Sequence, residues 1–221
     1  GLALGVVLLA AAVVAAATAT GSSPALPRVY GTPLSAVPPR LVVDLPGDRS
    51  VESYMGLGAW VDSFDADPAY SRRVPVVKAA DVVEMASHGV ETLFLQAART
   101  NDRSGLATSD PWVLAEFLLY GHRNGVDVVA WYLPMWASDG QDLDRLLALH
   151  RFEVLGHRFD GLAVDIEWNG DGLQPSERTA RLVDLTVSLR VATAGDPLGA
   201  IVMPPLITDE INPDFWPGFP W

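Results

Sequence analysis

The sequence predicts an α/β fold in which parallel strands alternate with helices, and two observations support that prediction. Short apolar runs with the lengths of buried strands recur along the chain, and longer segments with helical apolar spacing separate them. Alternation at this spacing is typical of parallel strands joined by right-handed crossovers. The expected strands are residues 56–62, 90–97, 126–134, 159–168 and 198–205.

Helical segments are expected between these strands, and capping signals mark several of their ends. Asp110 and Pro111 combine an N-cap residue with a proline at the first helical position. Gly89 and Gly125 stand where C-terminal glycines belong. The expected helical segments are residues 76–89, 110–125, 142–152 and 175–195.

Two parallel architectures fit this pattern, a (β/α)8 barrel and an open doubly wound sheet. Acidic and aromatic residues follow several different strands, as they do at the carboxyl-terminal face of a barrel. An open sheet would collect its site at one switch point, often with a glycine-rich loop, and the sequence has no such loop. The sequence therefore favours a partial TIM barrel at residues 54–221. Because a barrel needs eight strands, we expect the C-terminal units to be missing from this fragment.

The first 20 residues are apolar and uncharged, like the central region of a secretory signal. Ala17-Thr18-Ala19 offers a cleavage site of the small-x-small kind. A run of about 20 apolar residues can also span a bilayer. We therefore expect residues 1–20 to be a signal peptide or a membrane anchor, incomplete at its N-terminus. Residues 21–53, rich in Pro, Ser and Gly, predict a linker.

The composition excludes several classes of protein. The chain carries 15 Lys and Arg against 27 Asp and Glu, a net charge of −12, and has no basic cluster that would bind nucleic acid. The absence of cysteine excludes disulfides, zinc–thiolate sites and cysteine nucleophiles. Together with the apolar N-terminus, these features predict a protein that is secreted or held at the extracellular face of the cell membrane. No cofactor is expected.

The four histidines fall late in the expected helices or just before the next strand. Such positions lie at the amino-terminal edge of a parallel sheet, away from the usual active-site edge. A histidine-based triad or a zinc site is therefore not expected. These residues are His88, His122, His150 and His157.

The stretch FDGLAVDIEW, residues 159–168, ends an apolar strand with two carboxylates. Because side chains alternate along a strand, Ala163, Asp165 and Glu167 share one face, and the apolar residues between them share the other. Two like charges about 7 Å apart should raise the pKa of at least one of them. A general acid that works near neutral pH needs such a raised pKa.

The same stretch resembles the signature of chitinase-type glycoside hydrolases, Asp-Gly-x-Asp-x-Asp-x-Glu, which lies on the fourth strand of a TIM barrel. Residues 160–167 match every defining position except Ala163, where the family has an acid. The resemblance implies that Glu167 protonates the glycosidic oxygen and that Asp165 orients an acetamido group or stabilises the developing positive charge. The change at Ala163 argues against an N-acetyl-assisted mechanism and against chitin as substrate.

Polar and aromatic residues at the ends of the strands are candidates for binding sugar. Each has a structural alternative: capping for the acids, a solvated loop for the other polar groups, and core packing for the tryptophans. Because side chains alternate, Trp131 and Tyr132 cannot both face inward, so Trp136 in the following loop is the better aromatic platform. The substrate-binding candidates are Asp62, Asp65, Gln96, Arg99, Trp136 and Trp168.

The most specific expectation is an exported glycoside hydrolase that acts on a polysaccharide or oligosaccharide, with Glu167 and Asp165 as catalytic residues and no metal site. Three alternatives stay open. The barrel could bind carbohydrate without catalysis, or the chain could be an anchored structural protein of the cell envelope. The two acids could also belong to a buried ion-pair network with Arg99 or Lys78 as partners.

Overall fold

The computed structural model describes residues 49–71, 75–136, 140–168, 170 and 172–204. The expected signal peptide or anchor and residues 21–48 of the expected linker lie outside these ranges. Among the described residues, no helix is both long and apolar enough to cross a membrane.

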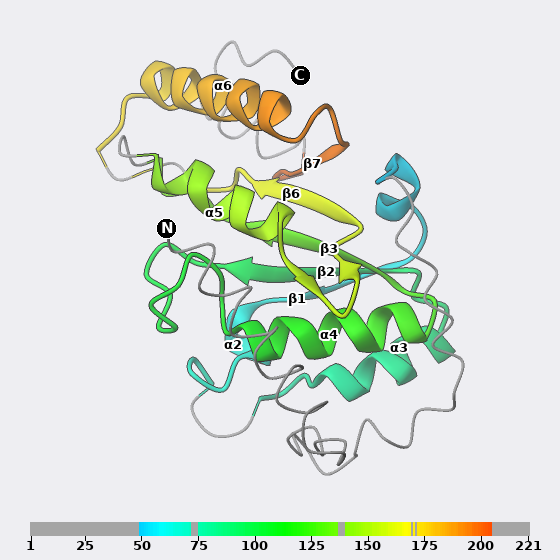
Figure 1. Cartoon of the computed structure of the whole chain (residues 1–221). Coiled ribbons are helices and arrows are strands. Elements are labelled where there is room, and N and C mark those ends of the chain that lie inside the picture. Colours follow the sequence, from blue (N-terminus) through cyan, green and yellow to red (C-terminus); the bar gives the residue numbers. More distant parts are fainter. Residues whose placement is uncertain (1–48, 72–74, 137–139, 169, 171, 205–221) are drawn as a thin grey trace, which may run out of the picture.

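Five strands form one parallel sheet, which confirms the predicted α/β class (Figure 1). The order of the strands in space is their order along the chain, so the described sheet has no point at which the direction of winding reverses. The strands, in that order, are β1 (Gly58–Val61), β2 (Thr92–Ala98), β3 (Asp127–Tyr132), β6 (Gly161–Asp165) and β7 (Leu198–Ile201).

The helices begin and end close to where the capping signals predict. The side chain of Asp110 accepts a hydrogen bond from the N–H of Trp112 at 2.9 Å, and Pro111 opens the helix. Gly89 and Gly125 adopt positive φ angles of 85° and 70° after their helices. The helices are α3 (Val82–Ser87), α4 (Pro111–Arg123), α5 (Gln141–His150) and α6 (Pro175–Ala192).

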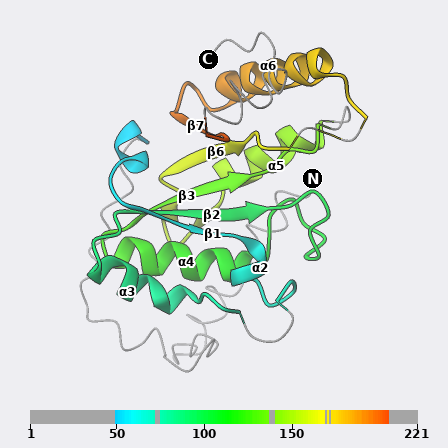
Figure 2. The ribbon, with the colours of Figure 1, turned by 180° about the vertical axis from the view of Figure 1, so that it is seen from behind.

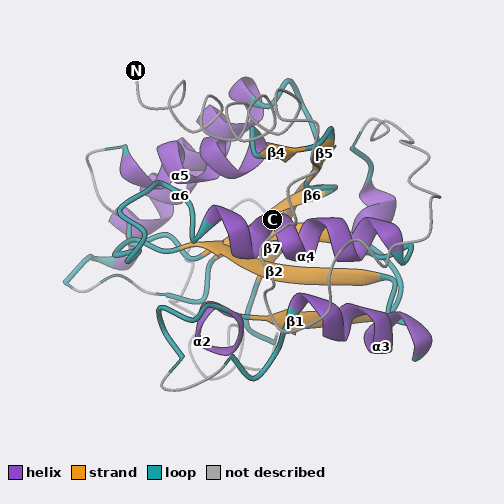
Figure 3. Cartoon of the chain, turned by 60° about the horizontal axis from the view of Figure 1, so that its bottom comes forward, coloured by secondary structure: helices purple, strands orange, loops and turns teal. Residues whose placement is uncertain are grey.

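Several short elements were not expected from the sequence. A 3-10 turn precedes α3, another precedes β1, and a single helical turn follows β1. A small antiparallel hairpin precedes β6 and can be followed in Figure 3. These elements are η3 (Ala79–Asp81), η2 (Val51–Tyr54), α2 (Ser63–Ala66), β4 (Glu153–Val154) and β5 (His157–Arg158).

The two faces of the sheet have different environments. Leu118 of α4, Leu149 of α5 and Leu182 of α6 all belong to one large core cluster, which also contains Leu95 of β2. A second, smaller cluster lies on the other face, which α4, α5 and α6 leave uncovered; Figure 2 shows the ribbon from behind. Right-handed crossovers between strands in sequential order place all connecting helices on one side, which accounts for this asymmetry.

The side chains of β6 alternate between these faces as predicted. Leu162 and Val164 belong to the helix-covered core, whereas Ala163 belongs to the cluster on the open face. The neighbouring strand behaves in the same way, with Tyr132 in the covered core and Trp131 on the open face. The prediction that these two aromatic residues do not share a face is therefore confirmed.

Tyr54 packs on the open face near the amino-terminal ends of β6 and β7. Its hydroxyl accepts the N–H of Leu162 at 2.8 Å and lies 3.0 Å from the carbonyl oxygens of Leu162 and Pro197, to either of which it can donate. A Cβ atom added to Gly161 would lie 2.7 Å from the tyrosine ring, and one added to Gly199 would lie 2.8 Å away. The two glycines therefore leave room for the ring.

Arg49 fixes the start of the packed domain to the amino-terminal edge of the sheet. Its guanidinium donates to Asp196 Oδ2 at 2.9 Å, to the carbonyl of Phe159 at 2.9 Å and to the carbonyl of His150 at 2.8 Å. Residues 49–53, which the composition grouped with the linker, therefore contact the domain directly.

His122, His157 and Asp160 form a cluster before the start of β6. The Nδ1 atoms of the two imidazoles are 2.7 Å apart, and His122 Nε2 lies 2.8 Å from Asp160 Oδ2. The same carboxylate oxygen accepts the N–H of Val128 at 2.7 Å. Asp160, the first acid of the glycosidase-like motif, therefore joins β3 to β6 at the edge opposite Glu167.

This cluster predicts that His157 makes the protein less stable as the pH falls below neutral. Burial, followed by the charge of His122, lowers the pKa of His157. The imidazole therefore takes up a proton more readily in the unfolded chain, so its contribution to the free energy of unfolding falls as the pH decreases from about 6.5 through the lowered pKa. Urea unfolding at pH 7.5 and 5.5 measures the change in each variant relative to the parent. Acidification should cost His157→Gln less stability than it costs the parent, whereas His88→Gln should follow the parent; the same change in all three proteins would contradict the assignment.

Candidate active site

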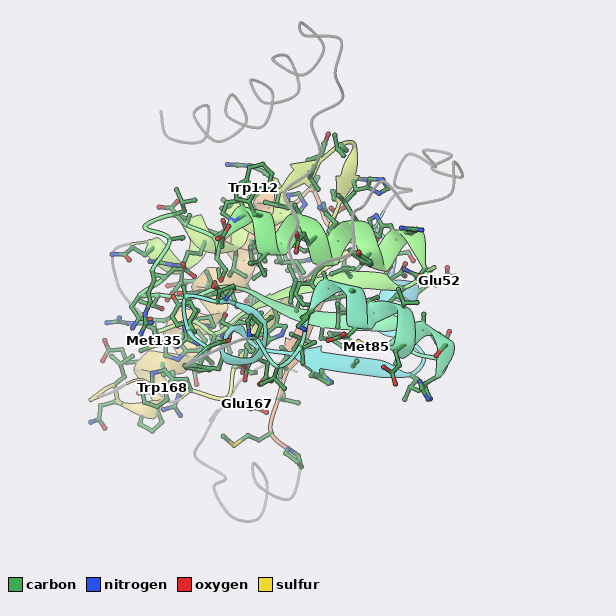
Figure 4. The ribbon with its side chains drawn as sticks, turned by 90° about the horizontal axis from the view of Figure 1, so that it is seen from below. Glu52, Met85, Trp112, Met135, Glu167 and Trp168 are labelled. Carbon is green, nitrogen blue, oxygen red and sulfur yellow. The ribbon has the colours of Figure 1, made fainter. Side chains whose placement is uncertain are left out.

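The carboxyl ends of the parallel strands bring the predicted acids and polar residues to one edge of the sheet. Asp62 follows β1, Arg99 follows β2 and Glu167 follows β6. In Figure 4, Glu167, Trp168 and Met135 lie toward one end of the molecule, and Glu52 and Met85 lie toward the other. The candidate site is therefore well separated from the histidine cluster at the amino-terminal edge.

Asp165 and Glu167 have different environments, because Asp165 is the last residue of β6 and Glu167 lies in the segment that follows it. Asp165 is only 7 % exposed, whereas the side chain of Glu167 is exposed to solvent. Burial is the main cause that raises the pKa of Asp165 to about 6, and the charge of Glu167 adds to it. A hydrogen bond from the N–H of Glu167 to Asp165 Oδ1, 2.9 Å long, acts in the opposite direction. Asp165 is therefore the acid with the raised pKa, and burial contributes more to the shift than the like charge from which the sequence predicted it.

No ion pair joins Asp165 or Glu167 to a cation anywhere in the described part of the chain. Arg99, one of the two partners considered, instead lies over the ring of Phe64, with its Cζ atom 4.4 Å from the ring centroid. A buried carboxylate without a cation destabilises the folded state when it is ionised. Asp165 therefore does not act as half of a stabilising ion pair among these residues.

An aromatic surface on the open face extends across β1, β2 and β3. Trp60 is 54 % exposed and stacks on Phe94, with centroids 4.2 Å apart and planes 10° apart. The rings of Trp131 and Trp60 meet edge to face, with centroids 6.5 Å apart and planes 60° apart. A hollow of about 360 Å³, lined in part by Trp60, Phe94, Ala163 and Ile201, opens here.

Trp60 was not among the sugar-binding candidates predicted from the sequence, although the alternation of side chains along β1 places it on the open face. Ala59 and Val61 pack in the helix-covered core, so the residue between them faces the open side. Its exposed ring presents an apolar surface that can pack against the C–H face of a sugar.

Trp136 does not form the exposed platform that the sequence suggested. It is 1 % exposed and belongs to the helix-covered core, and its indole N–H donates to the carbonyl of Trp168 at 2.7 Å. Its ring fills space beside the carboxyl end of β6 and offers no free face to a ligand. Trp168 is half-buried and packs against the same core, so it also serves in packing.

The acids after β1 hold the adjoining turn. Asp62 is the N-cap of α2 and accepts the N–H groups of Phe64 at 2.7 Å and of Asp65 at 3.1 Å. Asp65 is half-buried, and its backbone carbonyl accepts the N–H of Val77 at 3.1 Å. The observed contacts of Asp62 are therefore those of a helix cap, the structural alternative to sugar binding.

Gln96 links the first two strands at the site. It is buried, and its Oε1 atom accepts the N–H of Ser63 at 3.0 Å. The Nη1 group of Arg99 approaches the same oxygen at 3.5 Å, at the long limit for a hydrogen bond. Gln96 thus positions α2 against β2, which places the aromatic ring of Phe64 next to Arg99.

A buried network that the sequence did not indicate supports the loops after β2 and β3. The hydroxyl of Tyr132 donates to Asp142 Oδ1 at 2.6 Å and lies 2.9 Å from Thr100 Oγ1. The same Asp142 oxygen accepts the N–H of Met135 at 3.2 Å. Arg145 donates to the carbonyl of Thr100 at 2.7 Å. Burial, reinforced by Asp142, raises the pKa of Tyr132, so its hydroxyl remains a donor.

Across the described ranges, no group of three or more histidine or acidic side chains is arranged to hold a metal ion. Comparisons with known proteins found no match: no protein-family model, no curated protein and no solved structure corresponds to the chain.

Replacing Asp165 by asparagine should stabilise the protein at neutral pH. Because its pKa is about 6 in the folded protein and about 3.9 in the unfolded chain, the free energy of unfolding falls as the pH rises through this interval. Asparagine stays neutral and keeps an oxygen for the N–H of Glu167. At about 1.4 kcal/mol per pKa unit, Asp165→Asn should raise the free energy of unfolding by about 1–3 kcal/mol at pH 7.5.

Urea unfolding at pH 7.5 and pH 4 measures this gain, which should shrink at the lower pH. The exposed Glu167, changed to glutamine, is the matched control and should give no comparable gain. A loss of stability in Asp165→Asn at pH 7.5 would show that the ionised carboxylate has a favourable partner, and would contradict the account.

Proposed function

We propose that the chain is a glycoside hydrolase that acts on an extracellular polysaccharide, with Glu167 as the proton donor and Asp165 as its electrostatic partner. The observation that carries this proposal is the pairing of a buried carboxylate, whose pKa is raised to about 6, with an exposed carboxylate two residues later. Both lie at the carboxyl edge of a parallel sheet, where such enzymes hold their catalytic groups. The raised pKa alone would suit Asp165 as the donor. The resemblance to chitinase-type glycosidases and the exposed side chain at position 167 are the reasons for assigning that role to Glu167.

The difference in exposure suggests how the two acids divide the reaction. Glu167 is accessible to a bound glycan and donates its proton to the glycosidic oxygen as the bond to the anomeric carbon breaks. Positive charge then develops on the sugar ring. Asp165, ionised above about pH 6, stabilises that charge from the buried side of the pair. Water then adds to the anomeric carbon and its proton returns to Glu167, which completes hydrolysis and restores the donor. Trp60 supplies an exposed ring on which a sugar unit can stack.

We further propose that the five strands are one side of a (β/α)8 barrel. The sequential strand order, the helices on a single face and the apolar open face support this assignment. The open face would then be the barrel interior. A crystal structure tests the proposal, because pairing of both β1 and β7 into a closed sheet supports it, whereas edges that remain unpaired would reject it. Residues 1–20 would direct export or anchor the protein.

One observation favours a second candidate, a barrel that binds carbohydrate without cleaving it. Ala163 stands where the chitinase-type motif has an acid, and its surroundings are apolar, with Val129 and Trp131 in the same cluster. A purely structural role for the acids in the cell envelope is less consistent with the site. Asp165 has no cationic partner among the described residues, so its ionised form would lower the stability of the fold.

The proposal predicts sugar release that depends on both acids. Release should be measured with a panel of plant, fungal and bacterial glycans. Glu167→Gln should lower the rate by about 10²-fold or more, the usual contribution of a general acid. The rate of the parent should rise as the pH increases through about 6, because Asp165 ionises there, and this rise should vanish in Asp165→Asn.

Glu52→Gln is the matched control, since Glu52 is exposed at the opposite end of the molecule (Figure 4). Circular dichroism should verify that each variant is folded. Release that is unaffected by Glu167→Gln would reject the proton donor. A rate that falls as the pH rises through about 6 would instead make Asp165 the donor. Binding of a glycan without release would favour the binding module.

A further inference from the structure

The guanidinium of Arg99 is held firmly but uses few of its hydrogen-bond donors. Its Cζ atom lies 4.4 Å from the centroid of Phe64 and 4.9 Å from that of Tyr70. Its hydrogen bond to Gln96 is long, at 3.5 Å, and its Nε atom has no acceptor among the described residues. The two rings stand at 75° to each other, so the guanidinium contacts both without being sandwiched between them. Its Nε is buried, which leaves the Nη groups at the end of the side chain as the donors for a ligand.

Arg99 forms no ion pair with a carboxylate in the described ranges. Arg49 pairs with Asp196 and Arg181 with Glu177. Other described arginines, such as Arg103 and Arg145, also lack an ion pair, but they donate to backbone carbonyl oxygens.

The acids nearest to Tyr70 are already engaged by other groups. Asp67 Oδ1 accepts the N–H of Ala69 at 2.7 Å. The two oxygens of Asp102 accept the N–H of Ser104 at 2.8 Å and the hydroxyl of Ser109 at 2.9 Å. These carboxylates are held in their own turns and form no ion pair with Arg99 in the described ranges.

The strand register places Arg99 at the same level of the sheet as Asp165. Ala98 is paired with Tyr132, and Tyr132 with Val164, so Arg99 and Asp165 each come one residue later. Two strand spacings separate their backbones, roughly 10 Å, and the guanidinium extends from there toward Phe64 and Tyr70, which follow β1. A single bound oligosaccharide can span that distance and contact both residues.

We propose that Arg99 binds the carboxylate of an acidic sugar, and that the substrate is a polysaccharide containing carboxylated units. This inference rests on the proposed function, because it names the substrate of the same site. The planar guanidinium matches a carboxylate in a two-point interaction that a sugar hydroxyl cannot reproduce. The contacts with Phe64 and Tyr70 hold the group in place before the ligand arrives, which lowers the entropy lost on binding.

The test compares sugars that differ only by the acidic group. The pairs are glucuronate with glucose, galacturonate with galactose, and N-acetylmuramate with N-acetylglucosamine. Dissociation constants should be measured by NMR titration at pH 7.5 and low salt. At least one acid should bind about tenfold or more tightly than its neutral match, as expected for a charge-assisted pair, and added salt should reduce this preference.

Variants of Arg99 show whether the preference comes from this residue. Arg99→Met should bring the ratio of dissociation constants to about one. Arg99→Lys, which keeps the charge and loses the planar fork, should retain part of the preference. Arg103→Met is the matched control, because Arg103 lies over the same Tyr70 ring at 4.9 Å but donates to the carbonyl of Ala69. It should leave the preference unchanged.

The inference is overturned if no acid binds more tightly than its neutral match, or if the preference persists in folded Arg99→Met. Binding is measured without turnover, so its result is independent of catalysis. An acidic preference without sugar release from any glycan would keep the role of Arg99 and reject the hydrolase. Release from acidic glycans that is no faster than release from their neutral matches, and that is unchanged in Arg99→Met, would keep the hydrolase and reject the role of Arg99.

Discussion

The alternation of side chains along β6 is the constraint on which the rest of the structure depends. Leu162 and Val164 must face the helices to fill the core, so Asp165 must point to the open face. There it lies at the carboxyl edge of the sheet, buried and without a cationic partner among the described residues, and its pKa rises. The packing that stabilises the fold therefore also creates the perturbed acid.

The surroundings of that acid are built to be rigid. Tyr132 and Asp142 hold the loop after β3 from the core side, and Gln96 holds the turn after β1. Such support keeps reacting groups in place, which is how preorganised sites gain their effect. Asp165 itself lowers stability when ionised, as functional groups in low-dielectric positions commonly do. The stability of the fold therefore favours a neutral residue at position 165, whereas the proposed reaction needs the carboxylate.

Local pattern predicted much of this arrangement, and long-range contacts account for most of what it missed. Apolar periodicity located the strands and helices, and period-two alternation placed Asp165. The same rule could have identified Trp60. It could not reveal that Trp136, in an irregular loop, fills the core, because burial there has no sequence period. Nor could it show that Tyr54 bonds a strand 108 positions later, or that Arg49 meets Asp196 across 147 positions.

In the folded protein Asp165 keeps its proton up to about pH 6, and NMR titration of its side-chain carboxyl carbon tests this most directly. Labelled aspartate gives the signals, and Asp165→Asn identifies the one that belongs to this residue. The account predicts a midpoint near pH 6, shifted downward in Glu167→Gln because the neighbouring charge is removed. A midpoint close to the ordinary value of about 3.9 would contradict it.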